Sequence, residues 1–190
     1  MMIESFQNGL VYLIRTVFNL FLFVMIIRFI LAWVRADYFN PLTQITVRLT
    51  NPLVKPVRKI LHNYRDIELS SLVLIYLINT IKFMLIAVMS SGMPAILGLL
   101  ALSFADMLDL FIQVMMGALF LYVILSWIQP FSPVQRVLSQ VVSPIVTPFQ
   151  RILPPIAGFD LSIIPAFMVL QLTSIMLINP LYHWAATLTV

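Results

Sequence analysis

Residues 51–61 read NPLVKPVRKIL, and residues 143–153 read SPIVTPFQRIL. Each copy places a small polar residue before a proline, a second proline four residues later, and an Ile-Leu pair after a basic residue. The motif prolines are Pro52, Pro56, Pro144 and Pro148. This repetition predicts a chain built from two related halves.

The composition is typical of an integral membrane protein, with 62% apolar and 9% charged residues. The absence of cysteine excludes disulfides, thiolate metal sites and thiol nucleophiles. The net charge of +4 comes from basic residues gathered in one connection, which favours anionic lipid headgroups as partners. Direct binding to nucleic acid is not expected.

Crossing the hydrocarbon core of a bilayer takes about 20 apolar residues. Four stretches qualify: residues 10–34, 67–91, 104–128 and 161–178. Asn179-Pro180 is expected to break or kink the fourth stretch. The fold class is therefore an all-α polytopic membrane protein with four transmembrane helices.

The chain divides into a first repeat (1–92), a short apolar connector (93–103) and a second repeat (104–190). Ser103 and Asp106 match a capping box, so the third helix is expected to begin at Ser103. One continuous helix that includes the connector is the alternative.

Each repeat carries a long connection between its spans. Asn40-Pro41, Asn51-Pro52, Ser132-Pro133 and Ser143-Pro144 all have the form of an N-cap followed by proline at the first helical position. Pro56 and Pro148 forbid a long regular helix, so a bend or a fresh start is expected at each.

Beyond these prolines, apolar residues recur at helical spacing opposite basic or polar ones. The apolar positions are Val57, Ile60, Leu61 and Tyr64 in the first repeat, and Phe149, Ile152, Leu153 and Ile156 in the second. This pattern predicts an amphipathic hairpin in the membrane interface. Packing of the stripe on the protein's own spans is a compatible alternative.

A shift of 92 residues aligns the two motifs and also aligns Glu68-Leu-Ser70 with Asp160-Leu-Ser162. With two spans per half, the repeats must be parallel. The connections that contain the motifs hold most of the Lys and Arg residues, so both hairpins are expected in the cytoplasm and both termini in the periplasm.

The doubled proline motif, the preceding Leu-Ala-Trp33 or Leu-Ser-Trp127, and the following acid-Leu-Ser resemble the YggT family, also known as YlmG. The resemblance covers nearly the whole chain. It implies a bacterial inner-membrane protein linked to envelope or division functions, and in plastids to nucleoid distribution and cytochrome assembly. A looser implication is ion uptake under osmotic stress.

Three ionisable residues lie deepest in the predicted spans: Arg28, Lys82 and Asp109. Such groups are costly in hydrocarbon unless they are paired or reach the headgroups. A buried Lys82–Asp109 pair is one hypothesis. The alternative is that Arg28 and Lys82 extend to the membrane surfaces while Asp109 favours a helix N-terminus, as Glu68 and Asp160 would.

No motif for a catalytic triad, a phosphate loop, a dinucleotide site or a metal site occurs. The sequence therefore predicts no enzyme activity, no cofactor and no metal. The favoured function is a membrane organiser that contacts lipids or partner proteins through Lys55, Arg58, Lys59 and Arg151. The alternative is a channel or transporter component, which would need a homo-oligomer because four spans leave little room for a pore.

Overall fold

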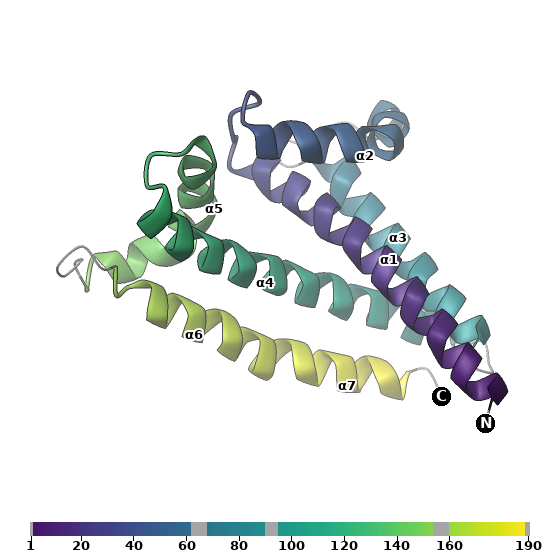
Figure 1. Ribbon diagram of the computed structural model, residues 1–190. Helices are drawn as coiled ribbons and strands as arrows, with labels where there is room; N and C mark the ends of the chain where they lie inside the picture. The colour runs from purple at the N-terminus through teal and green to yellow at the C-terminus, as the bar shows by residue number, and fades with distance from the viewer. Residues whose placement is uncertain (1, 62–67, 90–94, 154–159, 189–190) are drawn as a thin grey trace.

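The computed structural model describes residues 2–61, 68–89, 95–153 and 160–188, and all elements in these residues are helices (Figure 1). Four helical stretches are long and apolar enough to cross a membrane. They are α1 (Met2–Trp33), α3 (Leu69–Met89), α4 (Ile96–Ile128) and the continuous stretch Ile163–Thr187. The prediction of an all-α protein with four spans is confirmed.

Two further helices follow the first and third spans: α2 (Pro41–Ile60) and α5 (Pro133–Gln150). The Asn40 side chain accepts a hydrogen bond of 2.9 Å from the Leu42 N–H, and the Ser132 hydroxyl accepts one of 3.1 Å from the Gln135 N–H. Both helices therefore start at the predicted caps, with proline at the first position.

Both α2 and α5 run through their internal prolines, so the fresh helix starts predicted at Asn51 and Ser143 are wrong. A proline removes one backbone hydrogen bond, and a helix continues where the freed carbonyl finds another donor. The Ser143 hydroxyl, for example, donates at 3.2 Å to the Gln140 carbonyl, which Pro144 leaves without its usual partner. Figure 1 shows each ribbon changing direction part-way along, as expected near prolines.

The third span begins at Ile96 and not at Ser103, so the predicted capping box is wrong and residues 96–103 belong to α4. Ser103 is fully buried within the helix, and its hydroxyl donates at 2.8 Å to the Leu99 carbonyl one turn earlier. The run before Ser103 is rich in leucine and contains no proline, and the helix continues through its one poor helix former, Gly98.

The fourth span extends past the predicted end at Ile178. It consists of α6 (Ile163–Thr173), a π-helical turn η1 (Ser174–Ile178) and α7 (Asn179–Thr187), which lie along one line in Figure 1. The Asn179 N–H donates to the Ser174 carbonyl across the wider π turn. This turn precedes Pro180 and accommodates the proline without ending the span.

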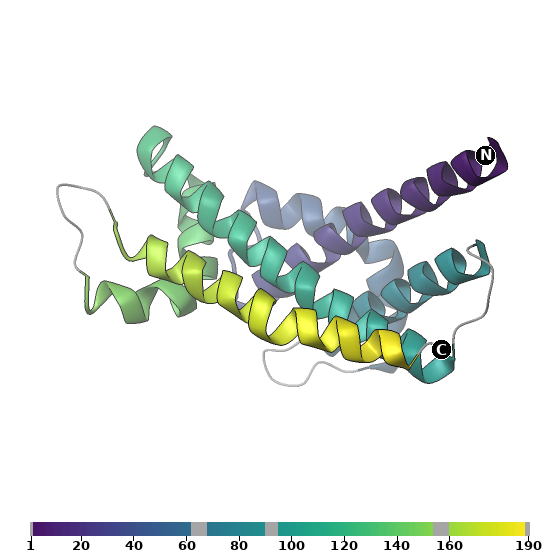
Figure 2. The ribbon, with the colours of Figure 1, turned by 90° about the horizontal axis from the view of Figure 1, so that it is seen from below.

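The two halves are joined along their spans. Within each half the spans pack on each other, α1 on α3 and α4 on α6 and α7, and the halves meet where α4 contacts α1 and α3. Phe29 and Phe111 form an edge-to-face contact between α1 and α4, with ring centroids 5.4 Å apart. Figures 1 and 2 show that α4 crosses beside both partner spans.

The helices α2 and α5 lie at the end of the molecule opposite both chain termini (Figure 1). The Asn40 amide donates at 2.7 Å to the Pro133 carbonyl, so the N-terminal ends of α2 and α5 touch. The parallel repeats thus bring their two hairpin helices to one end of the molecule.

Candidate functional site

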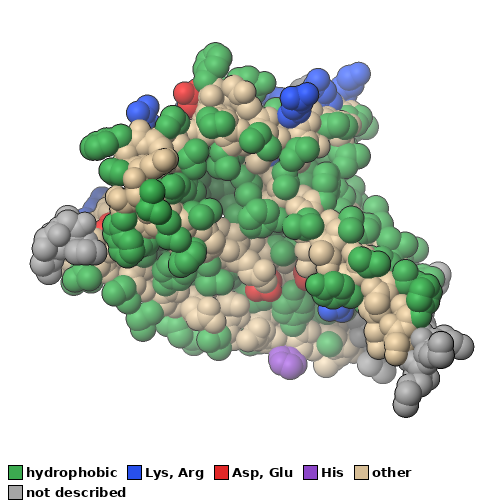
Figure 3. Space-filling model, viewed as in Figure 1, with side chains coloured by type: hydrophobic (Ala, Val, Ile, Leu, Met, Phe, Trp, Pro, Cys, Tyr) green, Lys and Arg blue, Asp and Glu red, His purple; other side chains and the backbone are tan. Residues whose placement is uncertain are grey.

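A cavity of about 560 Å³ lies between the last turns of α1, the length of α2 and the start of α3. Its charged lining residues are Arg28, Arg35, Lys55, Arg58 and Glu68. Figure 3 shows Lys and Arg side chains gathered over α2 at the top of the view. The predicted contact residues Lys55 and Arg58 therefore face a hollow as well as the exterior.

Arg28 and Glu68 form a buried ion pair beside this cavity. Arg28 Nε lies 3.1 Å from Glu68 Oε2, and Nη2 lies 2.9 Å from Oε1. This bidentate geometry is the strong form of an arginine–carboxylate contact. Arg28 is 6% exposed, so its guanidinium is enclosed by the protein and does not extend freely from the first span.

The remaining bonds of Arg28 reach α2. Its Nη1 donates to Thr50 Oγ1 at 2.8 Å and to Asn51 Oδ1 at 2.9 Å. One side chain of the first span thus binds the middle of α2 and the residue before α3. Asn51, predicted as a helix cap, instead orients this guanidinium from inside the helix.

The Glu68 carboxylate also accepts a 2.6 Å hydrogen bond from the Ser71 hydroxyl. Burial alone would raise the pKa of Glu68, but the hydrogen bonds from Arg28 and Ser71, with the positive charges of Arg28 and Arg58, lower that pKa below its ordinary value. The carboxylate is therefore ionised at neutral pH and neutralises the Arg28 charge.

The end of α1 places Arg35 at the rim of the cavity. Arg35 has a left-handed backbone (φ 53°), and the Ala36 N–H donates at 2.9 Å to the Leu31 carbonyl. This is the helix-ending turn that glycine usually makes, and a side chain in that conformation carries some strain. The turn sends the chain from the first span towards α2.

The predicted contact cations are all exposed. Lys55, Arg58 and Lys59 follow one another along the last turns of α2, and Arg151 directly follows α5. The four motif prolines are exposed too. The buried side of α2 consists instead of Thr43, Thr46, Thr50 and Val54.

The predicted apolar stripes are split between the protein and its surroundings. Val57 and Phe149 pack against the two buried clusters of the spans, whereas Ile60 is 81% and Ile152 is 77% exposed. Tyr64 and Ile156 lie outside the described residues. Placement of these helices in the membrane interface stays a prediction.

A second polar cluster lies within the spans. Lys82 Nζ on α3 is 2.6 Å from Asp106 Oδ2 on α4 and 3.0 Å from Asn19 Oδ1 on α1. The Tyr182 hydroxyl on α7 donates at 2.9 Å to the other oxygen of Asp106. Lys82 is 2% exposed, so the alternative that it extends to the membrane surface is wrong.

The predicted Lys82–Asp109 pair is wrong, because Lys82 pairs with Asp106. Asp109 lies one turn further along α4 and accepts a 2.8 Å hydrogen bond from the Gln113 amide. Its other oxygen lies 3.5 Å from the Ser174 hydroxyl of η1, at the limit of hydrogen-bond distance. Sequence reasoning placed Asp106 as a cap residue and therefore missed it as the partner of Lys82.

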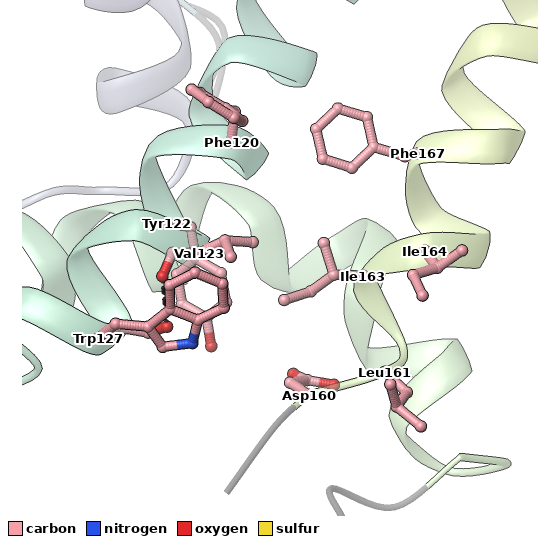
Figure 4. A pocket seen from close by; sticks show the side chains of 10 residues that line it. Phe120, Tyr122, Val123, Trp127, Asp160, Leu161, Ile163, Ile164 and Phe167 are labelled. Atoms are coloured by element: carbon pink, nitrogen blue, oxygen red, sulfur yellow. Dashed lines mark hydrogen bonds between the residues drawn. The ribbon is translucent and has the colours of Figure 1, made fainter.

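A third site lies between α4 and α6, as a cavity of about 520 Å³ (Figure 4). Side chains of α4, among them Tyr122 and Trp127, face those of α6 across it, and Asp160 lies at one end. Asp160 accepts hydrogen bonds from the Ser162 N–H at 3.1 Å and from the Gln150 amide at 2.7 Å. Its partners are thus neutral groups.

The repeat relates the first and third sites. Asp160 occupies the place of Glu68, and alignment of Trp33 with Trp127 puts Tyr122 at the place of Arg28. The first repeat has the buried ion pair Arg28–Glu68 at this place. In the second repeat the Asp160 carboxylate accepts hydrogen bonds from the Gln150 amide and from the Ser162 N–H. In the described residues no group of three or more His, Asp or Glu side chains is placed to hold a metal ion.

A family model described as CCB3/YggT matches this chain in two segments, residues 7–89 and 101–181. An uncharacterized protein of Pseudomonas aeruginosa is 40% identical over 92% of this chain and 91% of the relative. The Escherichia coli K12 protein named YggT is 32% identical over 87% of this chain and 86% of its own length. No solved structure matches the chain.

Proposed function

Since this chain belongs to the CCB3/YggT family, we propose that it is a non-enzymatic organiser or assembly factor of the bacterial inner membrane. It serves the biogenesis of the cell envelope, of the division apparatus or of membrane complexes. It does so by contacting anionic headgroups and partner membrane proteins with the exposed surfaces of α2 and α5.

The observation that carries this proposal is the division of α2 into two sides. Its buried side is held by the spans, through Thr50, Val54 and the Arg28 hydrogen bonds. Its exposed side offers Lys55, Arg58 and Lys59 together with the exposed apolar residues Ile45, Leu49, Leu53 and Ile60. Cations beside exposed apolar side chains suit a surface that lies on anionic lipid.

The two hairpin helices are unequal in charge. The motif in α2 carries three cations, whereas the corresponding segment of α5 is followed by Arg151 alone. A partner protein can approach α5 with less competition from anionic lipid. We assign α2 to lipid contact and α5 to protein contact.

The positive-inside rule places both hairpin helices in the cytoplasm and both termini in the periplasm. An alkaline phosphatase fusion after Val190 should be active in intact cells, and a green fluorescent protein fusion at the same site should stay dark. The same two reporters inserted after Gln129, in the turn before α5, should give the opposite pair of results. The reverse pattern would overturn this orientation.

Replacing Lys55, Arg58 and Lys59 together by glutamine should change the distribution of the protein in the membrane, because it removes about 1 kcal/mol of lipid attraction per cation. Replacing Arg151 by glutamine should instead change the set of proteins crosslinked in native membranes. Fluorescence imaging and crosslinking with mass spectrometry provide the two measurements. An unchanged distribution and unchanged crosslinks in both variants would contradict the organiser function.

The buried Lys82–Asp106–Tyr182 cluster favours a second candidate, a channel or transporter component. Charged groups inside spans occur along ion pathways, and this cluster joins α3, α4 and α7 near one end of the molecule. Potassium or sodium flux through the purified protein in liposomes, lost in Asp106→Asn, would favour this candidate over the organiser.

A further inference from the structure

We propose that the cavity between α1 and α2 is a binding site for one phosphate-ester anion, either a phospholipid headgroup or a small soluble phosphate. The cavity of about 560 Å³ falls in the usual range for small-ligand sites. The inference rests on the proposed function in one respect, the position of α2 at the headgroups. The proposed function uses only the exposed cations of α2, whereas this inference assigns a ligand to the cavity beside them.

The charges of the lining do not cancel. The Glu68 carboxylate is neutralised by the Arg28 guanidinium, which holds it at two points. Lys55 and Arg58 then add positive charge from two neighbouring turns of α2, and Arg35 lines the same cavity just after the end of α1. Guanidinium groups match phosphate oxygens in shape and are the usual ligands of phosphate in proteins.

Thr43 supplies an independent indication of a ligand. It lines the cavity and is 7% exposed, yet its hydroxyl oxygen has no hydrogen-bond partner among the described residues. The next threonines of the same side, Thr46 and Thr50, each donate to a carbonyl one turn earlier. A hydroxyl without a partner in this lining can donate to a phosphate oxygen once its side chain turns towards the cavity.

The corresponding position of the second repeat has a different lining. Gln135 occupies the place of Thr43 and lines a smaller cavity of about 330 Å³. There the unpaired buried atom is Oε1, a hydrogen-bond acceptor, and Arg136 is the sole charged residue among the described lining. With Arg136 as the one cation of its described lining, the second repeat offers a phosphate less positive charge, so the proposal is confined to the first repeat.

The test uses the full chain in neutral detergent, titrated with phosphatidylglycerol and analysed by native mass spectrometry. The parent protein should bind one lipid molecule saturably. Arg58→Gln should weaken this binding by about 10-fold to 100-fold, as expected for a charge-assisted hydrogen bond. Thr43→Val, which keeps the side-chain shape, should weaken it by about 2-fold to 10-fold while leaving thermal stability unchanged or higher.

Lys59→Gln is the matched control, because Lys59 is exposed on the same turn of α2 but does not line the cavity. It should change the affinity less than about 2-fold, as expected for a screened surface charge. An equal loss in Lys59→Gln and Arg58→Gln would show general surface attraction and overturn the proposal. Unchanged binding in both Arg58→Gln and Thr43→Val would overturn it as well.

A second arm identifies the source of the phosphate ester. Glycerol 3-phosphate is added to the protein without anionic lipid, and binding is followed as an increase in Tm. Saturable binding of this probe, or of phosphatidylglycerol, with the same response to the variants supports the site and names its source. If neither probe saturates, the site does not exist, whereas the organiser function depends on localisation and crosslinks and can still hold.

Discussion

Glu68→Ala should destabilise the folded protein by about 3–5 kcal/mol, because it leaves the Arg28 guanidinium buried without its carboxylate. The substitution leaves the hydrogen bonds from Arg28 to Thr50 and Asn51 in place, and it removes the acceptor of the Ser71 hydroxyl. The measurement is the free energy of unfolding in mixed micelles, with helix content as the signal.

Asp160→Ala is the matched control, since Asp160 occupies the same place in the second repeat but binds the neutral Gln150 amide. Its loss should cost about 1.5–3 kcal/mol, the range for hydrogen bonds to a charged group. The double variant Arg28→Met, Glu68→Leu should recover most of the stability because no charge remains buried. Equal effects of the two single variants would contradict the buried ion pair.

The second large effect is energetic coupling between Lys82 and Asp106. A double-mutant cycle with Lys82→Met and Asp106→Asn should give a coupling energy of about 1–3 kcal/mol, because the two charged atoms lie 2.6 Å apart in a buried position. Either single variant should be costly, since it leaves a charge inside the spans without its partner. The cycle is measured by the same unfolding method.

The control cycle replaces Asp106 by Asp109, one turn away on the same helix. Its coupling to Lys82 should stay below about 0.5 kcal/mol, the level found for residues without contact. Tyr182→Phe should lower the Lys82–Asp106 coupling, because its hydroxyl holds the second oxygen of Asp106. A stronger coupling to Asp109 would mean that the pairing in the structure is wrong.

Local rules predicted the starts of α2 and α5 but not their lengths. Asn40-Pro41 and Ser132-Pro133 act as caps because a side-chain oxygen can bind the first free N–H groups within a few residues. Asn51-Pro52 has the same form, yet it lies inside α2. There the packing of α2 on the spans and the bond from Arg28 outweigh the local signal.

The partners of the buried charges could not be read from the sequence. Arg28 and Glu68 are separated by 40 positions, and Lys82 and Asp106 by 24. Asp106 and Asp109 were equally available on one helix, and a rotation of that helix by less than one turn decides which of them faces Lys82. Such a rotation depends on the packing of α1, α3, α4 and α7 together.

By itself, the sequence determined the membrane class, the four spans, the two repeats and the family, because these follow from apolar lengths and from residues close together in the chain. Only the tertiary structure decided that the motif of residues 51–61 continues a helix, and that Arg28 and Thr43 lie beside its cations around one cavity. The physical reason is that charge pairing and cavity shape depend on how helices rotate and pack, which no local pattern records.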